Sequence, residues 1–337
     1  MSDAGLTVAV TGPTGTFGFG LIPLLQADPR IERVVGIARR PFDPQQHGWS
    51  KMQYRRGDVR DPDALREAFA GAHVVVHLAF MITGTASRDA IRAINVEGTL
   101  NAFGAAAAAG AERFVYASSV AAYGFHENNP IGMTEDWPTR PASRLFYAQE
   151  KAELEQLLRE QADAHPDLAL YLVRPPIVLG PHAVGAKDSL PAPLAALAQR
   201  ALDFANRLPV PVPVPVPDLP MQFIHEHDVG QALLRCVVAD GPAGAYNIAG
   251  DGMVTAADVV RELGFTPITV PAGIAQGAAR AASQVPLPSF APPAAEWVEA
   301  ASHPAIMDTG KAKRELGWQP RYTGLEALRD MLRRAPS

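Results

Sequence analysis

Two side chains four positions apart, Tyr147 and Lys151, have the residue types and spacing for proton transfer. Positions i and i+4 of a helix lie on one face, so we expect the Lys151 ammonium near the Tyr147 phenol. A free phenol has a pKa of about 10, and a neighbouring positive charge lowers it. The pair therefore indicates a general acid or base acting on a substrate oxygen. Tyr and Lys with this spacing also occur on many surface helices, so the pattern needs support from elsewhere in the chain.

That support comes first from a glycine-rich segment, Thr11 to Gly18, which directly follows an apolar run and precedes a helical pattern. Glycines let the backbone turn tightly and approach a pyrophosphate, while a helix N-terminus supplies N–H donors. The spacing is G-x-x-G-x-x-G, and ligand-free turns of this kind exist, but the context favours dinucleotide binding. The candidate binding residues are Gly12, Thr14, Gly15, Thr16, Phe17 and Gly18.

The expected second strand ends in Ala38, followed by Arg39 and Arg40. An acidic residue at this position would bind the ribose of NAD, whereas two guanidinium groups suit the 2′-phosphate of NADP. NADP is therefore favoured over NAD, and the alternative is that both arginines belong to a solvated turn. After the third strand come Asp58 and Val59; Asp58 either accepts a hydrogen bond from the adenine amino group or caps a turn.

The elements that must position these residues alternate between strand and helix. Apolar runs typical of buried parallel strands lie at 6–10, 34–38, 74–79, 114–117 and 168–173. Segments of helical length and spacing lie at 17–26, 64–69, 91–109 and 148–161. This βαβ repetition predicts an α/β fold, a Rossmann-type doubly wound parallel sheet.

Beyond Gly180 the alternation gives way to Pro-rich and Ala-rich segments. We expect residues 1–180 to form the dinucleotide-binding domain, with 222–250 returning to it, and 181–221 and 251–337 to form a smaller C-terminal substrate-binding lobe. Val and Pro alternate from Pro209 to Pro217, which predicts an extended segment or an edge strand.

Composition narrows the class of protein. The chain has 337 residues, 47% of them hydrophobic, and its 30 Lys and Arg against 35 Asp and Glu give a net charge of -5. This balance argues against nucleic acid or an anionic membrane as partner and favours a small-molecule substrate. A single cysteine, Cys236, cannot form an internal disulfide, and no apolar run reaches the roughly 18 residues of a membrane helix. The cytoplasm is the expected location, and no metal site is expected.

These motifs together resemble the extended short-chain dehydrogenases/reductases, which include the NAD-dependent epimerases and dehydratases. Y-x-x-x-K at Tyr147 and Lys151 is joined by Ser119 four residues ahead of Tyr123-Gly124. Further matches, which extend the resemblance from Val8 to about Pro320, are His77-Leu78-Ala79, Asn95 to Thr99, Arg174-Pro175-Pro176, Phe223 to Asp228, Tyr246 to Ala249 and Glu315 to Pro320.

The resemblance implies roles for individual residues. Tyr147 would exchange the proton, Lys151 would hold the nicotinamide ribose, and Ser119 would bind the reacting oxygen. It also implies a homodimer, formed by the helices at 91–109 and around Tyr147. Further cofactor-binding residues implied are Leu78, Ala79, Asn95, Pro175 and Ile177.

Two departures from the family pattern bear on the substrate. Ile177 and Met221 stand where nucleotide-sugar members carry polar residues that contact the diphosphate. The sequence therefore predicts an NAD(P)-dependent oxidoreductase acting on a carbonyl or hydroxyl carbon of an apolar substrate. The alternatives are a nucleotide-sugar epimerase or dehydratase with transient hydride transfer, and a non-catalytic dinucleotide-binding scaffold or sensor.

Overall fold

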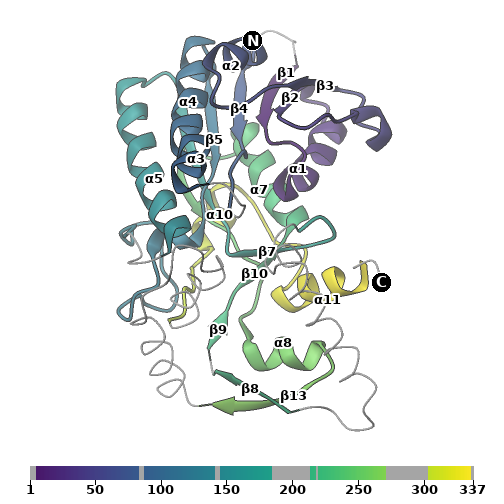
Figure 1. The fold of residues 1–337 in the computed structure, drawn as a ribbon, viewed down its shortest axis with the longest axis vertical. Coiled ribbons are helices and arrows are strands. Elements are labelled where there is room, and N and C mark those ends of the chain that lie inside the picture. Colours follow the sequence, from purple (N-terminus) through teal and green to yellow (C-terminus); the bar gives the residue numbers. More distant parts are fainter. Residues whose placement is uncertain are drawn as a thin grey trace.

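A seven-stranded parallel sheet forms the centre of the protein in this computed structural model, which describes residues 5–82, 87–140, 145–183, 213–217, 219–270 and 303–334 (Figure 1). The strand order is β11-β6-β5-β4-β1-β2-β3. The strands are β1 (Leu6–Thr11), β2 (Ile31–Ala38), β3 (Met52–Arg56), β4 (Val74–His77), β5 (Arg113–Ala117), β6 (Ala169–Arg174) and β11 (Gly244–Asn247). All neighbouring strands pair in parallel, which confirms the predicted fold class.

Helices cover both faces of this sheet. Along β1, Val8 and Val10 face one core cluster, and Ala9 between them faces the other, as strand alternation requires. The first cluster packs α1 (Thr16–Ala27) and α7 (Glu226–Val237) on the sheet. The second packs α2 (Pro62–Phe69), α4 (Gly98–Ala108) and α5 (Phe146–Ala164).

The helix expected at 91–109 is divided in the structure. It consists of α3 (Arg88–Arg92), a five-residue π-helical turn η2 (Ala93–Glu97) and α4. The Thr99 hydroxyl, at the start of α4, donates to the carbonyl of Asn95 in this turn at 2.5 Å. Turns of this kind are rare and often lie at functional sites.

The helices α1 and α7 cross at two glycines. A Cβ on Gly20 would lie 2.1 Å from the Glu226 carbonyl oxygen, and a Cβ on Gly230 would lie 2.1 Å from the Gly20 carbonyl oxygen. Only glycine permits such a close approach of two backbones. The crossing fixes α7 against the helix that follows the glycine-rich turn.

A second group of elements lies beyond the carboxyl ends of the strands (Figure 1). It contains three strand pairs: β7 (Ile177–Leu179) with β10 (Phe223–His225), β9 (Pro220–Met221) with β12 (Val254–Thr255), and β8 (Pro213–Pro217) with β13 (Thr266–Val270). The helices here are α8 (Ala256–Glu262) and α11 (Gly324–Arg334), while α10 (Gly310–Glu315) packs against β11.

The alternating Val-Pro segment forms the parallel strand β8, as expected for the part of it that the structure describes. Pro213 and Pro215 are exposed, whereas Val216 is buried against Ala257 and Val260 of α8. The remainder of the segment, 209–212, lies outside the described residues.

Short connecting turns are η1 (Pro44–His47) and η3 (Val120–Tyr123). Across the described residues, no helix has the length and apolar character needed to span a membrane.

Candidate active site

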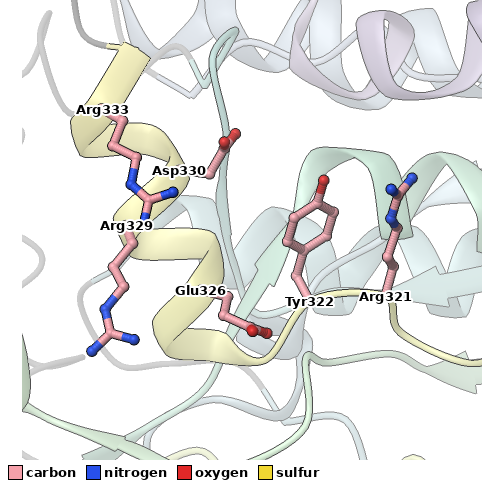
Figure 2. Close-up of a pocket in the computed structure, with 6 residues that line it drawn as sticks. All are labelled: Arg321, Tyr322, Glu326, Arg329, Asp330 and Arg333. Carbon is pink, nitrogen blue, oxygen red and sulfur yellow. The ribbon is translucent and has the colours of Figure 1, made fainter.

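A surface pocket of about 340 Å³ lies beside α11 and not beside the predicted catalytic residues. Figure 2 shows Arg329 and Arg333 on α11, with Tyr322 and Arg321 on the segment that precedes it. The Arg329 guanidinium pairs with Glu262 at 2.7 Å, and the pocket also contains the carboxylates of Glu326 and Asp330. The helix α11 and the Tyr147 helix α5 lie on opposite sides of the molecule in Figure 1.

The carboxyl ends of β1 and β4 are joined through a buried histidine. His77 Nδ1 lies 2.9 Å from the Thr11 hydroxyl, and His77 Nε2 lies 3.0 Å from the Thr99 hydroxyl. Complete burial lowers the pKa of His77 to about 3, so the ring is neutral. The Thr11 hydroxyl also accepts the backbone N–H groups of Leu78 and Ala79, each at 3.2 Å. These contacts hold the segment after β4 beside the glycine-rich turn.

The glycine-rich turn has the shape that a phosphate needs. Gly12 has φ +66°, and a Cβ there would lie 3.0 Å from Ala79, while a Cβ on Gly18 would lie 2.0 Å from the Pro13 carbonyl oxygen. Gly15 precedes α1 without a side-chain cap, and the first turn of α1 has no acidic residue. The N–H groups of this helix end are therefore directed at a position suited to an anion.

The segment after β7 approaches the same helix end. The Thr16 hydroxyl donates to the His182 carbonyl at 2.9 Å. The His182 ring stacks on Phe19 with centroids 4.2 Å apart, and its Nδ1 lies 2.7 Å from a Glu226 carboxylate oxygen. The sequence analysis missed this contact because its partners lie 166 positions apart and belong to no local motif.

The segment after β2 is held by side chains of β3. The Tyr54 hydroxyl donates to the Ala38 carbonyl at 3.2 Å and also to the Arg40 carbonyl, and Arg56 Nε donates to the Arg39 carbonyl at 3.0 Å. The Arg39 and Arg40 side chains are exposed. Both guanidinium groups are thus placed at the end of β2 and remain accessible to a ligand.

Asp58 and Val59 lie at the end of β3. Asp58 pairs with Arg60 at 2.7 Å and accepts the Arg60 backbone N–H at 3.0 Å, and these contacts hold its pKa below the usual value. Asp58 therefore has the turn geometry that the sequence analysis left open as an alternative. Val59 is buried against Gly98 at the start of α4.

Ser119 and Tyr147 come together at the carboxyl end of β5. Ser119 precedes η3, and its hydroxyl accepts the Ala121 N–H at 3.1 Å. A side-chain hydrogen bond joins Ser119 to Tyr147. Burial nevertheless raises the pKa of Tyr147 to about 12, so its phenol is protonated at neutral pH. The pair places a hydroxyl and a phenolic proton side by side.

The Lys151 ammonium lies 5.8 Å from the centroid of the Tyr147 ring, but its hydrogen bonds are made elsewhere. It donates to the Tyr116 hydroxyl at 3.0 Å and to the Ala117 carbonyl at 2.7 Å, both on β5. Lys151 is 3% exposed, and burial lowers its pKa to about 7. The i,i+4 rule places the two residues on one face of α5, but it ignores acceptors on the neighbouring strand, and these orient the ammonium.

Asn95, predicted to bind the cofactor, lies in the protein interior and not in an open groove. Its side chain is fully buried, and its amide oxygen accepts the Met81 N–H at 2.7 Å. Its amide nitrogen donates to the Met81 carbonyl at 2.9 Å and to Glu150 at 2.7 Å. Asn95 therefore holds the backbone of the segment after β4.

Pro175 and Ile177 follow the end of β6. The Pro175 carbonyl accepts the Val120 N–H at 2.9 Å, next to Ser119. Ile177, at the start of β7, is 51% exposed. Met221, the other departure from the family pattern, pairs with Val254 and packs in a small apolar cluster.

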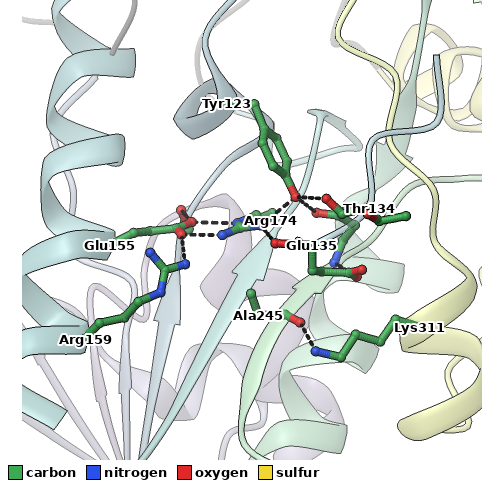
Figure 3. Close-up of polar contacts among 10 residues, drawn as sticks. Tyr123, Thr134, Glu135, Glu155, Arg159, Arg174, Ala245 and Lys311 are labelled. Atoms are coloured by element: carbon green, nitrogen blue, oxygen red, sulfur yellow. Dashed lines mark hydrogen bonds and ion pairs between the residues drawn. The ribbon is translucent and has the colours of Figure 1, made fainter. Parts of the chain in front are cut away.

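A buried ionic network lies behind the site (Figure 3). Arg174 donates to both Glu155 oxygens, at 2.8 and 2.5 Å, and to the Tyr123 hydroxyl at 2.5 Å. The Ser118 hydroxyl donates to Glu155 at 2.6 Å, and the Tyr123 hydroxyl donates to Asn247 at 2.8 Å. The network connects the end of β5, next to Ser119, with α5, β6 and β11. Sequence matching pointed to Arg174 and Tyr123 without assigning them this contact.

The histidine-rich segment at the start of α7 is structural. His225 caps α7 by accepting the His227 N–H at 3.1 Å. Asp228 accepts the backbone N–H groups of Arg321 and Tyr322, each at 3.0 Å. The described residues contain no group of three His, Cys, Asp or Glu able to hold a metal.

A family model for NAD-dependent epimerases/dehydratases matches residues 8–249. The chain belongs to this family. Among solved structures, the family fold is shared by MoeE5 in complex with UDP-glucuronic acid and NAD, with a TM-score of 0.70 at 24% identity over 97% of this chain and 98% of that one.

The curated relatives found by sequence comparison carry names that describe different activities or none. An uncharacterized protein of Mycobacterium tuberculosis is 28% identical over 97% of this chain and 83% of its own length. An Escherichia coli undecaprenol-linked N-acetylglucosaminyl 4-epimerase is 31% identical over 51% of this chain and 49% of its own length. The type 7 3β-hydroxysteroid dehydrogenase of Rattus norvegicus is 31% identical over 46% of this chain and 48% of its own length.

Proposed function

We propose that the protein is an NAD(P)-dependent oxidoreductase that transfers hydride to or from a carbonyl or hydroxyl carbon, with Tyr147 as general acid/base. The observation that carries this proposal is the hydrogen-bonded pair of Ser119 and Tyr147 at the carboxyl end of β5. Ligands of doubly wound folds bind at this end of the strands. In the reducing direction Tyr147 donates its proton to the substrate oxygen while Ser119 orients that oxygen.

The dinucleotide supplies hydride chemistry when bound. The end of α1 after Gly15, which has no side-chain cap, and the close approach allowed by Gly12 fit its pyrophosphate. Leu78 and Ala79, fixed through the Thr11 hydroxyl, line the groove beside this turn. Lys151 holds the nicotinamide ribose in this proposal.

The dinucleotide that we propose is NADP, with NAD as the alternative. Arg39 and Arg40 are exposed at the end of β2, and their backbone is fixed by Tyr54 and Arg56. Two guanidinium groups held in this way can pair with the 2′-phosphate of NADP. MoeE5 is described in complex with NAD. The proposed preference for NADP therefore rests on residues of this chain and not on that neighbour.

The substrate that we propose is an apolar carbonyl or hydroxyl compound. Ile177 exposes half of its surface, and it offers no donor to a diphosphate. An unpaired phosphate would be costly to bring there. A nucleotide-sugar epimerase or dehydratase is the second candidate, because MoeE5 is described with UDP-glucuronic acid. Positively charged side chains that could bind the diphosphate would favour this second candidate. Of these, Arg321 lines the pocket beside α11. The others, Arg144, Lys187, Arg200 and Arg207, lie outside the described residues.

The decisive experiment incubates the protein with each dinucleotide and a panel of hydroxysteroids, apolar ketones and nucleotide sugars. Net formation or loss of reduced nicotinamide with an apolar substrate supports the proposal. Isomerised or dehydrated nucleotide sugar without net redox change supports the second candidate. Calorimetry with UDP, dTDP and GDP at saturating dinucleotide is the parallel test, in which micromolar binding contradicts the apolar assignment. A homodimer through α4 and α5 is part of the proposal, and sedimentation measurements test it.

A further inference from the structure

The aromatic ring of Phe80 lies directly over the Lys151 ammonium. The distance from Lys151 Nζ to the Phe80 ring centroid is 3.7 Å, closer than to the rings of Tyr116 and Tyr147, at 4.6 and 5.8 Å. The same Phe80 ring meets the Tyr147 ring edge-on, with centroids 5.6 Å apart at 88°. One apolar side chain therefore contacts both of the residues proposed for proton transfer and ribose binding.

This contact limits how many N–H donors the Lys151 ammonium can offer to a ligand. An ammonium has three N–H donors. Two of them are used on the Tyr116 hydroxyl and the Ala117 carbonyl. The Phe80 ring covers the ammonium on its remaining side, where a ligand hydroxyl would have to bind. A ribose hydroxyl can reach the third donor only after the ring has moved.

We propose that Phe80 is a positioning residue, which excludes water from the Lys151 ammonium and holds it against β5 until a ligand hydroxyl displaces the ring. The inference rests on the proposed function in one respect only, namely that Lys151 is the ribose-binding group. The cover itself concerns the protein without ligand and is testable without a substrate.

The backbone next to Phe80 is held by the side chain of Asn95. The Asn95 amide brackets the next residue, Met81, by bonding both its N–H and its carbonyl. Glu150 fixes the Asn95 amide in turn, and one Glu150 oxygen is buried without a hydrogen-bond partner. The π-helical turn η2 places Asn95 under this segment. The sequence of contacts Glu150, Asn95, Met81 thus determines where Phe80 lies.

The charged and titratable groups around the Lys151 ammonium come from three elements. Glu150 and Glu155 on α5 raise its pKa, whereas burial lowers it and outweighs them. The remaining neighbours are Tyr116 on β5, Tyr147 on α5 and the neutral His77 at the end of β4. The ring of Phe80 has opposing effects, because its face attracts a cation while its bulk excludes water. Burial of Lys151 as a whole lowers its pKa despite the two carboxylates.

These opposing effects make two substitutions diagnostic. Phe80→Ala removes the cover, so water reaches the ammonium and the pKa of Lys151 rises by about one unit, a tenfold change in the protonation equilibrium. Phe80→Leu keeps an apolar cover but loses the ring face, so the pKa stays level or falls. The readout is the pH dependence of Lys151 acetylation by acetic anhydride, measured by peptide mass spectrometry with Lys313 as internal reference.

Matched controls separate this effect from a general loss of packing. Phe146 precedes Tyr147 on α5, but its ring lies near the Arg88 guanidinium at 5.3 Å, so Phe146→Ala should leave Lys151 titration unchanged. Asn95→Ala should shift Lys151 in the same direction as Phe80→Ala. Asn101→Ala should not, because Asn101 bonds the Val59 carbonyl instead.

Cofactor binding supplies the second readout. Phe80→Ala should bind NADPH or NADH at least as tightly as the parent protein, because no ring has to be displaced, and bound dinucleotide should change the acetylation rate of Lys151. If Lys151 titrates identically in the parent, Phe80→Ala and Phe80→Leu proteins, the inference is wrong. If Lys151 shifts as described but no dinucleotide binds, the cover is real and the proposed function fails.

Discussion

At the scale of single residues, Tyr147 holds its proton firmly, because burial raises its pKa to about 12. Replacement by Phe removes the transferable proton while the ring still packs. We expect Tyr147→Phe to lower kcat by roughly 10² to 10⁴-fold and to leave the dinucleotide Kd unchanged. Steady-state kinetics and fluorescence titration measure the two quantities. Tyr322→Phe, in the pocket beside α11, is the control that should retain normal turnover.

Cofactor preference depends on Arg39 and Arg40. Changing both to Ala should weaken NADPH binding by about 1.5 to 3 kcal/mol, the value of hydrogen bonds to a charged group, and leave NADH binding nearly unchanged. Arg55→Ala controls for the loss of exposed charge, because among the described residues Arg55 pairs only with Glu67, 3.9 Å away at the surface. Tighter binding of NADH than of NADPH by the parent protein would contradict the NADP assignment.

The buried His77 makes stability depend on pH. Its pKa falls from 6.5 to about 3 on folding, so between these values the unfolded chain binds a proton that the folded chain does not. The stabilisation by His77 is complete above the unfolded pKa and is lost as the pH decreases toward 3, on the order of 5 kcal/mol in all. Urea unfolding of the parent and His77→Gln proteins across this window should show a shallower pH dependence in the variant. Equal slopes would mean that His77 is not the group responsible.

At the scale of elements, the crossing of α1 and α7 tolerates no side chain at Gly230. We expect Gly230→Ala to lower the free energy of unfolding by about 1 to 3 kcal/mol, because an added methyl group overpacks the contact. Gly104 lies exposed within α4 with open space around it. Gly104→Ala should therefore raise stability by about 0.5 to 1 kcal/mol, since alanine loses less backbone freedom in a helix. Denaturant titration of both variants tests the pair.

Local elements were more predictable than the contacts between them. The strand Leu6–Thr11 and the helix after it follow from an apolar run and a glycine-rich turn. The π-helical turn at Ala93–Glu97 does not, because the local pattern there is that of one continuous helix; its Asn95 side chain bonds Met81, 14 positions earlier. In the site, residue types predicted Ser119 and Tyr147, which lie within hydrogen-bonding reach of each other. The orientation of Lys151 depends on acceptors of β5, which no spacing within α5 reveals.

At the scale of the whole molecule, Asp228 joins α7 to the C-terminal segment. Its carboxylate accepts two backbone N–H groups, of Arg321 and Tyr322, in a fully buried position. Asp228→Asn should leave one of these donors unpaired and cost about 1 to 3 kcal/mol. Proteolytic cleavage around residues 318–323 should be faster in the Asp228→Asn variant than in the parent protein. Asp251→Asn is the surface control, since Asp251 is exposed and pairs only with Lys313 among the described residues.

The Val-Pro strand β8 has a consequence for self-association. Prolines carry no N–H, so the donors that β8 contributes to its pairing with β13 must come from Val214 and Val216. Backbone groups of alternate residues point to opposite sides of a strand, and the outer side of β8 therefore presents carbonyls from proline but no donors. A strand of another molecule cannot form a regular ladder on such an edge. The repeated proline protects a small two-stranded sheet from intermolecular β-pairing and aggregation.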